Sequence, residues 1–230
     1  MNVCAKSVVQ QMAESSAISA LPEASSRGGA IATCVSLCAF VFSGFSLYES
    51  ALKQPQLETF VPPVIHYGRD GGGSVEVFAV PITITNEGAR TATVLSMELD
   101  VTDAAGTTKR YYSAYLGEHP RDASVVNRAF APATINGRDV FSQTVRFYPM
   151  GNPLPALVSD SGAYKFKLTL KTARPSDPDL LDQYLRKEPQ PVSFDLTLPW
   201  FSEQQLNFRR AAIAMHQKDW QPTMGGGELN

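Results

Sequence analysis

The hydrophobic positions of this chain follow two different periods, and the change between them divides the sequence. Residues 28–48, GGAIATCVSLCAFVFSGFSLY, contain no Asp, Glu, Lys or Arg. As a helix rising about 1.5 Å per residue, this stretch would cross roughly 30 Å, the thickness of a bilayer's hydrocarbon core. Beyond residue 57 the period becomes two, which is typical of strands with one apolar face. The pattern predicts one spanning helix followed by a β-rich domain.

The apolar stretch has three competing interpretations. A buried core helix is disfavoured because uncharged stretches of this length are rare in soluble domains. A cleaved signal peptide would have a short basic segment and a small-residue cleavage site. Here 27 residues precede the stretch and Ser43-Gly44-Phe45-Ser46 is a poor site, although a translation start nearer Arg27 would favour the signal peptide. We therefore expect an uncleaved signal-anchor helix over residues 28–53.

The flanks of this helix bear on its orientation. Arg27 lies on the N-terminal side, and Glu49 and Lys53 lie on the other, so the basic residues are nearly balanced. The short N-terminal tail with Arg27 beside the membrane slightly favours an N-inside orientation. The prediction is a bacterial inner-membrane protein that contacts the bilayer through residues 28–48 and carries its C-terminal domain on the periplasmic side.

Small residues form a stripe along the helix. Ala30, Cys34 and Cys38 recur at i, i+4 and i+8, and such stripes allow another helix to approach closely. The stripe is a candidate helix-packing surface, while ordinary anchor composition is the alternative explanation.

Seven segments of the remaining chain alternate apolar and polar side chains. They are residues 57–67, 75–85, 91–102, 109–116, 139–148, 162–171 and 192–198. In the clearest of them Leu95, Met97, Leu99 and Val101 are expected to face inward. No long helix separates the strands, which excludes parallel βαβ topology. Two facing antiparallel sheets would bury every apolar face, so we predict a β-sandwich over residues 57–199, with a closed barrel as the alternative.

A short motif and a longer stretch carry a family resemblance. Asp160-Ser161-Gly162-Ala163-Tyr164 resembles the tyrosine corner that enters strand F of immunoglobulin-like sandwiches. The stretch FAVPITITNEGARTATVLSMELDV is similar to the B–C region of membrane-proximal immunoglobulin-like domains in bacterial proteins. The whole chain resembles uncharacterised single-pass bacterial membrane proteins of that build. The resemblance implies a mainly β, immunoglobulin-like antiparallel sandwich in which Tyr164 bonds to upstream backbone.

The resemblance has limits. Antibody-type domains have two core cysteines, whereas this domain has none, and Phe166 stands where the second would be. No function carries over, because this fold serves adhesion, chaperone, accessory and structural roles alike.

The two ends of the chain differ from its centre. Residues 1–27 form a polar segment that we expect to be flexible. In the C-terminal segment, residues 200–230, Ser202 with Gln205 fits a capping box, which predicts a helix over residues 203–216.

Composition excludes some functions without selecting one. The chain has 230 residues and a formal net charge of -2, which gives no general field for capturing nucleic acid. The three cysteines are Cys4, Cys34 and Cys38, so the β-domain is expected to contain no disulfide.

The search for chemistry finds no strong motif. The three histidines lack metal-ligand spacing: His66, His119 and His216. The acidic segment lacks the EF-hand pattern: Asp177, Asp179 and Asp182. The glycine-rich segment 69–74 joins two strands, whereas a phosphate cradle needs a helix N-terminus. We expect no catalytic residue, no metal and no cofactor.

The best surface candidate is an aromatic group, Tyr111, Tyr112 and Tyr115. Strand alternation directs at least one of Tyr111 and Tyr112 away from the core, and tyrosine is enriched at interfaces. An ordinary cross-strand aromatic pair is the alternative. The sequence thus predicts a non-enzymatic, membrane-anchored accessory subunit that contacts a membrane or periplasmic protein. The alternative is a ligand-binding module or an enzyme whose site is assembled from scattered residues.

Overall fold

The structure is a computed structural model that describes residues 26–70, 74–117, 128–174, 180–202, 204 and 212–220. The chain divides into two compact units, Met1–Ser46 and Leu47–Asn230.

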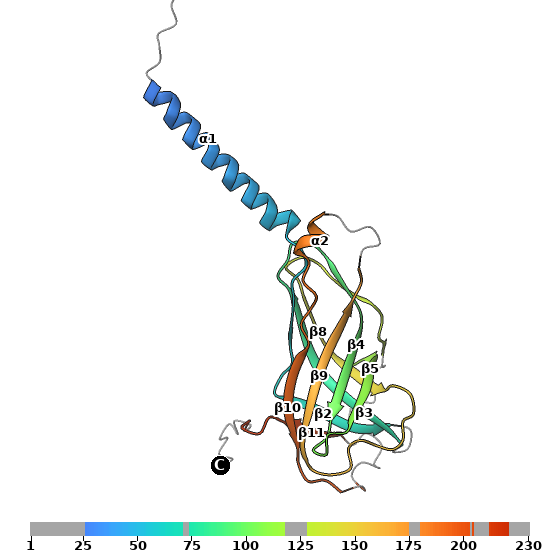
Figure 1. Cartoon of the computed structure of the whole chain (residues 1–230). Helices are drawn as coiled ribbons and strands as arrows, with labels where there is room; N and C mark the ends of the chain where they lie inside the picture. The colour runs from blue at the N-terminus through green and yellow to red at the C-terminus, as the bar shows by residue number, and fades with distance from the viewer. Residues whose placement is uncertain are drawn as a thin grey trace, which may run out of the picture. The chain divides into compact units, whose positions relative to one another are not determined.

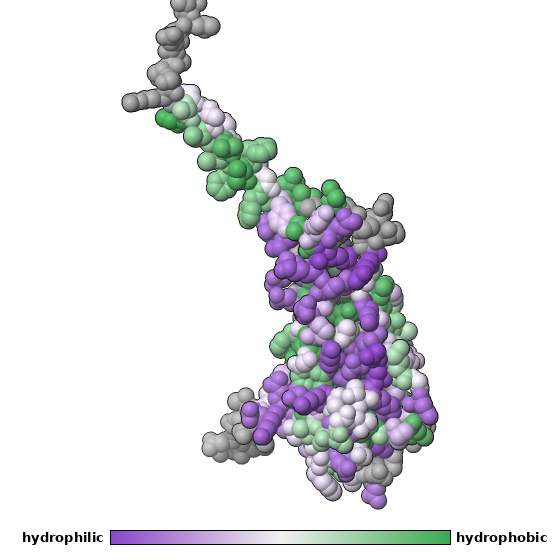
Figure 2. Space-filling model, viewed as in Figure 1, coloured by the Kyte–Doolittle hydropathy of each residue, from purple (hydrophilic) through white to green (hydrophobic). Residues whose placement is uncertain are grey.

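The first unit contains the helix α1, Ser26–Leu47 (Figure 1). Its large apolar side chains are exposed, including Phe40 at 76% and Phe42 at 72%. Figure 2 shows the hydrophobic colour dominating this helix. In the described part of the chain, one helical stretch, Gly29–Leu52, is long and apolar enough to cross a membrane. The predicted apolar helix is confirmed, and length and composition alone make it a candidate anchor or signal sequence.

The second unit is built mainly of strands (Figure 1). A short π-helix, η1 (Tyr48–Leu52), follows α1 directly, and a short helix, α2 (Leu180–Leu185), precedes the tenth strand. The strands are β1 (Leu57–Phe60), β2 (Val64–Asp70), β3 (Val75–Asn86), β4 (Ala92–Thr102), β5 (Thr108–Leu116), β6 (Arg128–Ala129), β7 (Ala133–Ile135), β8 (Val140–Pro149), β9 (Gly162–Thr172), β10 (Val192–Leu198) and β11 (Ala212–His216).

The strands close into a ring. Antiparallel pairing runs β5–β8–β3–β2–β11–β10–β9–β4, and β4 pairs with β5 again. The result is a closed eight-stranded barrel, with β1, β6 and β7 attached to β3, β5 and β4 respectively. The predicted immunoglobulin-like sandwich is therefore wrong. The alternation of apolar and polar residues shows only that each strand has an apolar face, and a sandwich and a barrel both bury such faces. The two are distinguished by the pairing of β5 with both β4 and β8, which closes the sheet into a barrel.

The C-terminal strand β11 completes the ring. It pairs with β2 over five residues, Ala212–His216, and meets β10 through Thr197 and His216. The helix predicted over residues 203–216 is wrong for residues 212–216, whereas residue 204 is helical and residues 203 and 205–211 lie outside the described residues. Met215 is buried while Ala214 is exposed, so the segment follows the period of a strand.

Side chains fill the barrel interior. Phe78 lies at the centre of an aromatic group, with ring centroids 5.2 Å from Tyr67, 4.9 Å from Tyr111 and 5.7 Å from Phe166. One face of β3 contributes Phe78, Val80, Ile82 and Ile84, all of them buried. The interior is thus a packed core, as expected for a barrel of this strand number.

One predicted inward residue points outward. Leu95 is 46% exposed, whereas Val94 is fully buried. The register of β4 against β9 shifts between Val94 and Ser96, which marks a bulge. A bulge inserts one residue and reverses the alternation on its N-terminal side, so Val94 takes the inward position that was predicted for Leu95.

Candidate functional site

The three predicted contact tyrosines fall on opposite faces of β5. Tyr111 is fully buried in the barrel, while Tyr112 and Tyr115 are 42% and 38% exposed. Tyr111 is therefore unavailable to a partner, which corrects that part of the prediction. Tyr115 stacks edge-on against Tyr148, with ring centroids 5.6 Å apart, so a cross-strand pair accounts for its position. Partner contact by Tyr112 and Tyr115 stays a prediction.

The predicted helix-packing residues are all exposed on α1. Ala30, Cys34 and Cys38 lie within the helix, and both cysteines are free thiols. A partner helix for this stripe stays a prediction.

Two of the three histidines lie on neighbouring strands, because His66 is paired with Ala214 and His216 with Val64. His66 lies in β2 and His216 in β11, while His119, Asp177 and Asp179 lie outside the described residues. Among the described residues, no group of three His, Cys, Asp or Glu side chains is placed to hold a metal.

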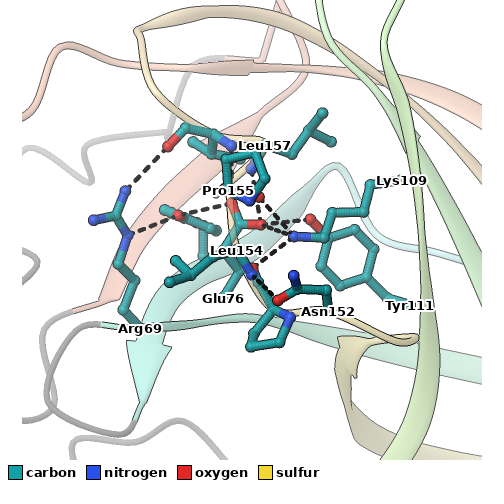
Figure 3. A network of polar contacts seen from close by, with 11 residues as sticks. Arg69, Glu76, Lys109, Tyr111, Asn152, Leu154, Pro155 and Leu157 are labelled. Atoms are coloured by element: carbon teal, nitrogen blue, oxygen red, sulfur yellow. Dashed lines mark hydrogen bonds and ion pairs between the residues drawn. The ribbon is translucent and has the colours of Figure 1, made fainter.

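A buried carboxylate that sequence reasoning did not single out organises one part of the barrel (Figure 3). Glu76 is fully buried in β3. Its Oε1 accepts hydrogen bonds from the Tyr67 hydroxyl at 3.2 Å and the Val158 N–H at 2.8 Å. Its Oε2 accepts from the Tyr111 hydroxyl at 2.8 Å and the Leu157 N–H at 2.9 Å.

Two cations stabilise this network. Lys109 Nζ lies 3.4 Å from Glu76 Oε2 and also donates to the carbonyl oxygens of Pro153 and Pro155. Arg69 donates to the Tyr67 hydroxyl and to the Val158 carbonyl. The carboxylate and both cations thus fasten the loop between β8 and β9 to the barrel wall. Both oxygens of the buried Glu76 carboxylate thus have partners within the barrel unit.

The network changes the acidity of its phenols. Burial and the neighbouring Glu76 carboxylate raise the pKa of both Tyr67 and Tyr111 well above the ordinary value of 10. The sequence contains an indication of this network. Glu76 lies at an alternate position to Phe78, Val80, Ile82 and Ile84 in β3, so its side chain is on the same face of the strand as theirs. That position places a carboxylate on the core face, where it needs partners.

The tyrosine predicted to bond to upstream backbone does so. The Tyr164 hydroxyl donates to the Asp160 carbonyl at 2.7 Å. The predicted bond is confirmed, but it occurs here in a barrel and so does not distinguish a sandwich.

A buried asparagine fixes the segment that follows η1, residues 53–56, which we call the stem. Asn86 is 1% exposed, and its Oδ1 accepts from the N–H groups of Gln56 and Gly88. Its Nδ2 donates to the carbonyl oxygens of Arg90, Ile135 and Asn136. This one side chain joins the stem, the β3–β4 turn and the segment after β7.

Backbone bonds add to this attachment. The Lys53 carbonyl accepts from the N–H groups of Ala89 and Arg90, and Arg138 donates to the Glu49 carbonyl. A Cβ on Gly88 would lie 2.1 Å from the Gln54 carbonyl oxygen, so only glycine permits this approach. The stem is therefore an integral part of the barrel unit.

A groove of about 480 Å³ runs beside β1. Residues 56–59 form one wall and residues 187–192, at the start of β10, form the other. Within the described residues, neither β1 nor the first half of β10 has a strand partner on the side facing the groove. We call this surface the β1 groove.

A second groove, of about 310 Å³, begins at the stem. It is lined by Gln54, Pro55, three arginines and the intervening residues of two loops; the arginines are Arg90, Arg174 and Arg186. We call it the arginine groove. The residues that line the two grooves include no histidine and no cysteine.

In the described part of the chain, these features define the class of protein: an eight-stranded antiparallel barrel that follows one long apolar helix. No family model matches the chain, and comparison with curated proteins gives no match. Among solved structures, the crystal structure of the Putative ApaA Protein from Bordetella pertussis matches 73% of this chain and 98% of its own, at 14% identity and a TM-score of 0.28. With so low a TM-score, the description of the barrel and its grooves rests on the pairing and contacts given above.

Proposed function

We propose that the chain is a single-pass membrane protein whose barrel binds an extended segment of a partner protein in the β1 groove. The observation that carries the proposal is the pair of strand edges on either side of this groove, which have no strand partner among the described residues. An open edge offers a row of backbone N–H and C=O groups, which an added strand satisfies. The N-inside orientation expected from Arg27 would place the barrel on the periplasmic side of a bacterial inner membrane.

The barrel itself supplies a precedent for the strand. β1 and β2 pair with the same edge of β3, and β11 lies between β2 and β10, antiparallel to both. The Gln217 N–H still bonds to the Pro63 carbonyl, but the chain then turns at Lys218 and Asp219. β11 therefore ends before it could pair with β1. A partner segment antiparallel to β1 and β10 would lie between these two strands, as β11 lies between β2 and β10.

The direction of the β1 backbone groups supports main-chain recognition. The Gln56 carbonyl accepts from the Glu87 N–H on the β3 side. Because backbone groups alternate between the two edges of a strand, those of Leu57 and Thr59 are directed into the groove. Both residues line it.

Substitution at Thr59 separates main-chain from side-chain binding. Thr59→Pro removes an outward N–H, whereas Thr59→Ala keeps it and removes only the hydroxyl and methyl groups. The full chain, carrying a photoreactive residue at Glu58, is irradiated in membranes, and the crosslinked peptide is identified by mass spectrometry. We expect one extended partner segment, retained with Thr59→Ala and lost with Thr59→Pro.

Three results would refute the proposal. Crosslinks only to a second copy of this chain would remove the partner. A crosslink to residues 221–230 would show that the chain's own tail fills the groove. Equal crosslinking of Thr59→Pro and Thr59→Ala would exclude main-chain recognition.

The membrane anchor is tested separately. Alkaline carbonate should leave the full chain in the membrane pellet, and a reporter fused after Asn230 should be active on the periplasmic side.

A further inference from the structure

The strands around the β1 groove define which residues would lie beside an added strand. Residues opposite one another on neighbouring strands form a row across the sheet. Ala79 of β3, His66 of β2 and Ala214 of β11 form one such row. His216 lies two residues further along β11, and it pairs with Thr197 of β10. These pairs fix the register of β10 relative to β3.

The same rows extend to the two walls of the groove. Thr59 of β1 pairs with β3 five rows beyond the first row. The row of Thr197 is two rows beyond the first, so Phe194, three residues earlier in β10, lies in the row of Thr59. Leu57 and Val192, each two residues earlier in their strands, share another row. A strand in the groove would therefore place one residue in each of these two rows.

The side chains of the two rows point inward and are incompletely covered. All four are half-buried, whereas Glu58 and Ser193, which lie between them in sequence, are exposed. Alternation therefore directs the four toward the core, and Leu57 and Phe194 already pack against it. Leu198, at the end of β10 that meets β11, is only 1% exposed. This difference indicates the burial that a neighbouring strand provides.

We propose that the partner segment bound in the β1 groove carries apolar side chains at two alternate positions, i and i+2, one in each of these rows. The inference rests on the proposed function, because it specifies the partner of the same groove. Leu57, Val192 and Phe194 flank the two positions, so a polar side chain there would lose water without gaining a partner. Valine and other β-branched residues suit such positions in a strand. The residue between the two faces outward beside Glu58, where we expect a polar side chain.

The chain itself can supply a test strand, because β11 ends beside the groove. After His216 the chain turns at Lys218 and Asp219. If β11 continued straight instead, positions 219 and 221 would fall in the two rows. The valine variant replaces the turn with an alternating strand through five substitutions: Lys218→Thr, Asp219→Val, Trp220→Thr, Gln221→Val and Pro222→Thr.

A threonine variant is the matched control. It shares the changes at positions 218, 220 and 222 but carries Asp219→Thr and Gln221→Thr. Threonine has nearly the shape and strand preference of valine, and it differs by a hydroxyl in place of a methyl group. Any loss of stability from removing the turn therefore affects both variants equally.

Both variants are unfolded with urea as full chains in neutral detergent. We expect the valine variant to unfold at a urea concentration about 1 M higher than the threonine variant, because two buried hydroxyls without partners are destabilising. A photoreactive residue at Glu58, which lies beside position 220 in this register, should crosslink to the chain's own residues 219–221 in the valine variant. Because the tethered strand then fills the groove, crosslinking to a partner in membranes should fall about tenfold or more.

The outcomes separate this inference from the proposed function. Equal urea midpoints, with the crosslink to position 220 present in both variants, would refute the apolar pattern and leave main-chain binding in the groove intact. Absence of this crosslink from both variants would refute the register. If the valine variant forms the crosslink but the unaltered chain captures no partner in membranes, the proposed function fails while the two apolar positions of the groove stand.

Discussion

Replacing Glu76 with glutamine tests whether a buried carboxylate fastens the β8–β9 loop to the barrel. Glutamine has nearly the same shape, but one of its two terminal positions is an NH2 donor. If the NH2 takes the place of Oε1, the Val158 N–H loses its acceptor. If it takes the place of Oε2, the Leu157 N–H and Lys109 lose theirs. Both orientations therefore leave a buried donor without a partner.

The expected change in the free energy of unfolding follows from these lost hydrogen bonds. A buried donor without a partner costs about 1–3 kcal/mol, and each bond to a neutral acceptor is weaker than one to a carboxylate by about 1 kcal/mol. The less costly orientation leaves one amide unpaired and weakens the remaining bonds, so we expect the free energy of unfolding to fall by about 3 kcal/mol. With a urea dependence of about 2 kcal/mol per molar, the midpoint of unfolding should fall by about 1.5 M.

The assay is urea unfolding of the full chain in neutral detergent, followed by circular dichroism. Glu87→Gln is the matched control, because the Glu87 side chain is exposed in a turn and its change should stay within about 0.5 kcal/mol. Hydrogen exchange at Leu157 and Val158 should accelerate in Glu76→Gln. If both variants unfold at the same urea concentration, the carboxylate does not hold the loop and the reasoning fails.

Three further predictions concern the stem and the tyrosines. Gly88→Ala places a methyl group against the Gln54 carbonyl and should cost about 2–3 kcal/mol, with faster proteolysis at the stem. The raised pKa values of Tyr67 and Tyr111 mean that stability is fully present below pH 10 and falls as the pH rises above it. Between pH 9 and 11 the two phenols should together lose about 2.7 kcal/mol of stability, measured by urea unfolding at each pH. Tyr164→Phe removes one bond and should lower the free energy of unfolding by about 1 kcal/mol, whereas no change would assign that bond no net value.

Local features of the fold were predictable because they depend on local patterns. The alternation of apolar and polar residues predicted the seven main strands within a few residues. The structure divides the first of them at Pro62-Pro63 into β1 and β2. The bond of Tyr164 also followed from a motif five residues long. Each of these inferences needed only the residues of one segment.

Long-range pairing was not predictable in the same way. A sandwich and a barrel bury the same alternating faces, and they differ in which strands meet. One strand of the ring, β11, has only one fully buried apolar side chain, Met215, so its alternation is weak. The partners of Glu76 come from β2, β5 and the β8–β9 loop. The position of Glu76 on the apolar face of its strand indicates that the carboxylate needs partners, but not which residues supply them.

The arrangement of the ring gives a reason for the position of the β1 groove. β3 and β8 pair over eight residues, from Phe78 to Thr85, whereas β10 and β11 meet through one residue pair. Among the described residues, the pairing between β10 and β11 is therefore the shortest in the ring. The β1 groove continues this seam, where β1 and the start of β10 lie with their backbone groups available. A strand added there would strengthen the weakest side of the barrel, so binding of an extended partner and completion of the fold would be the same event.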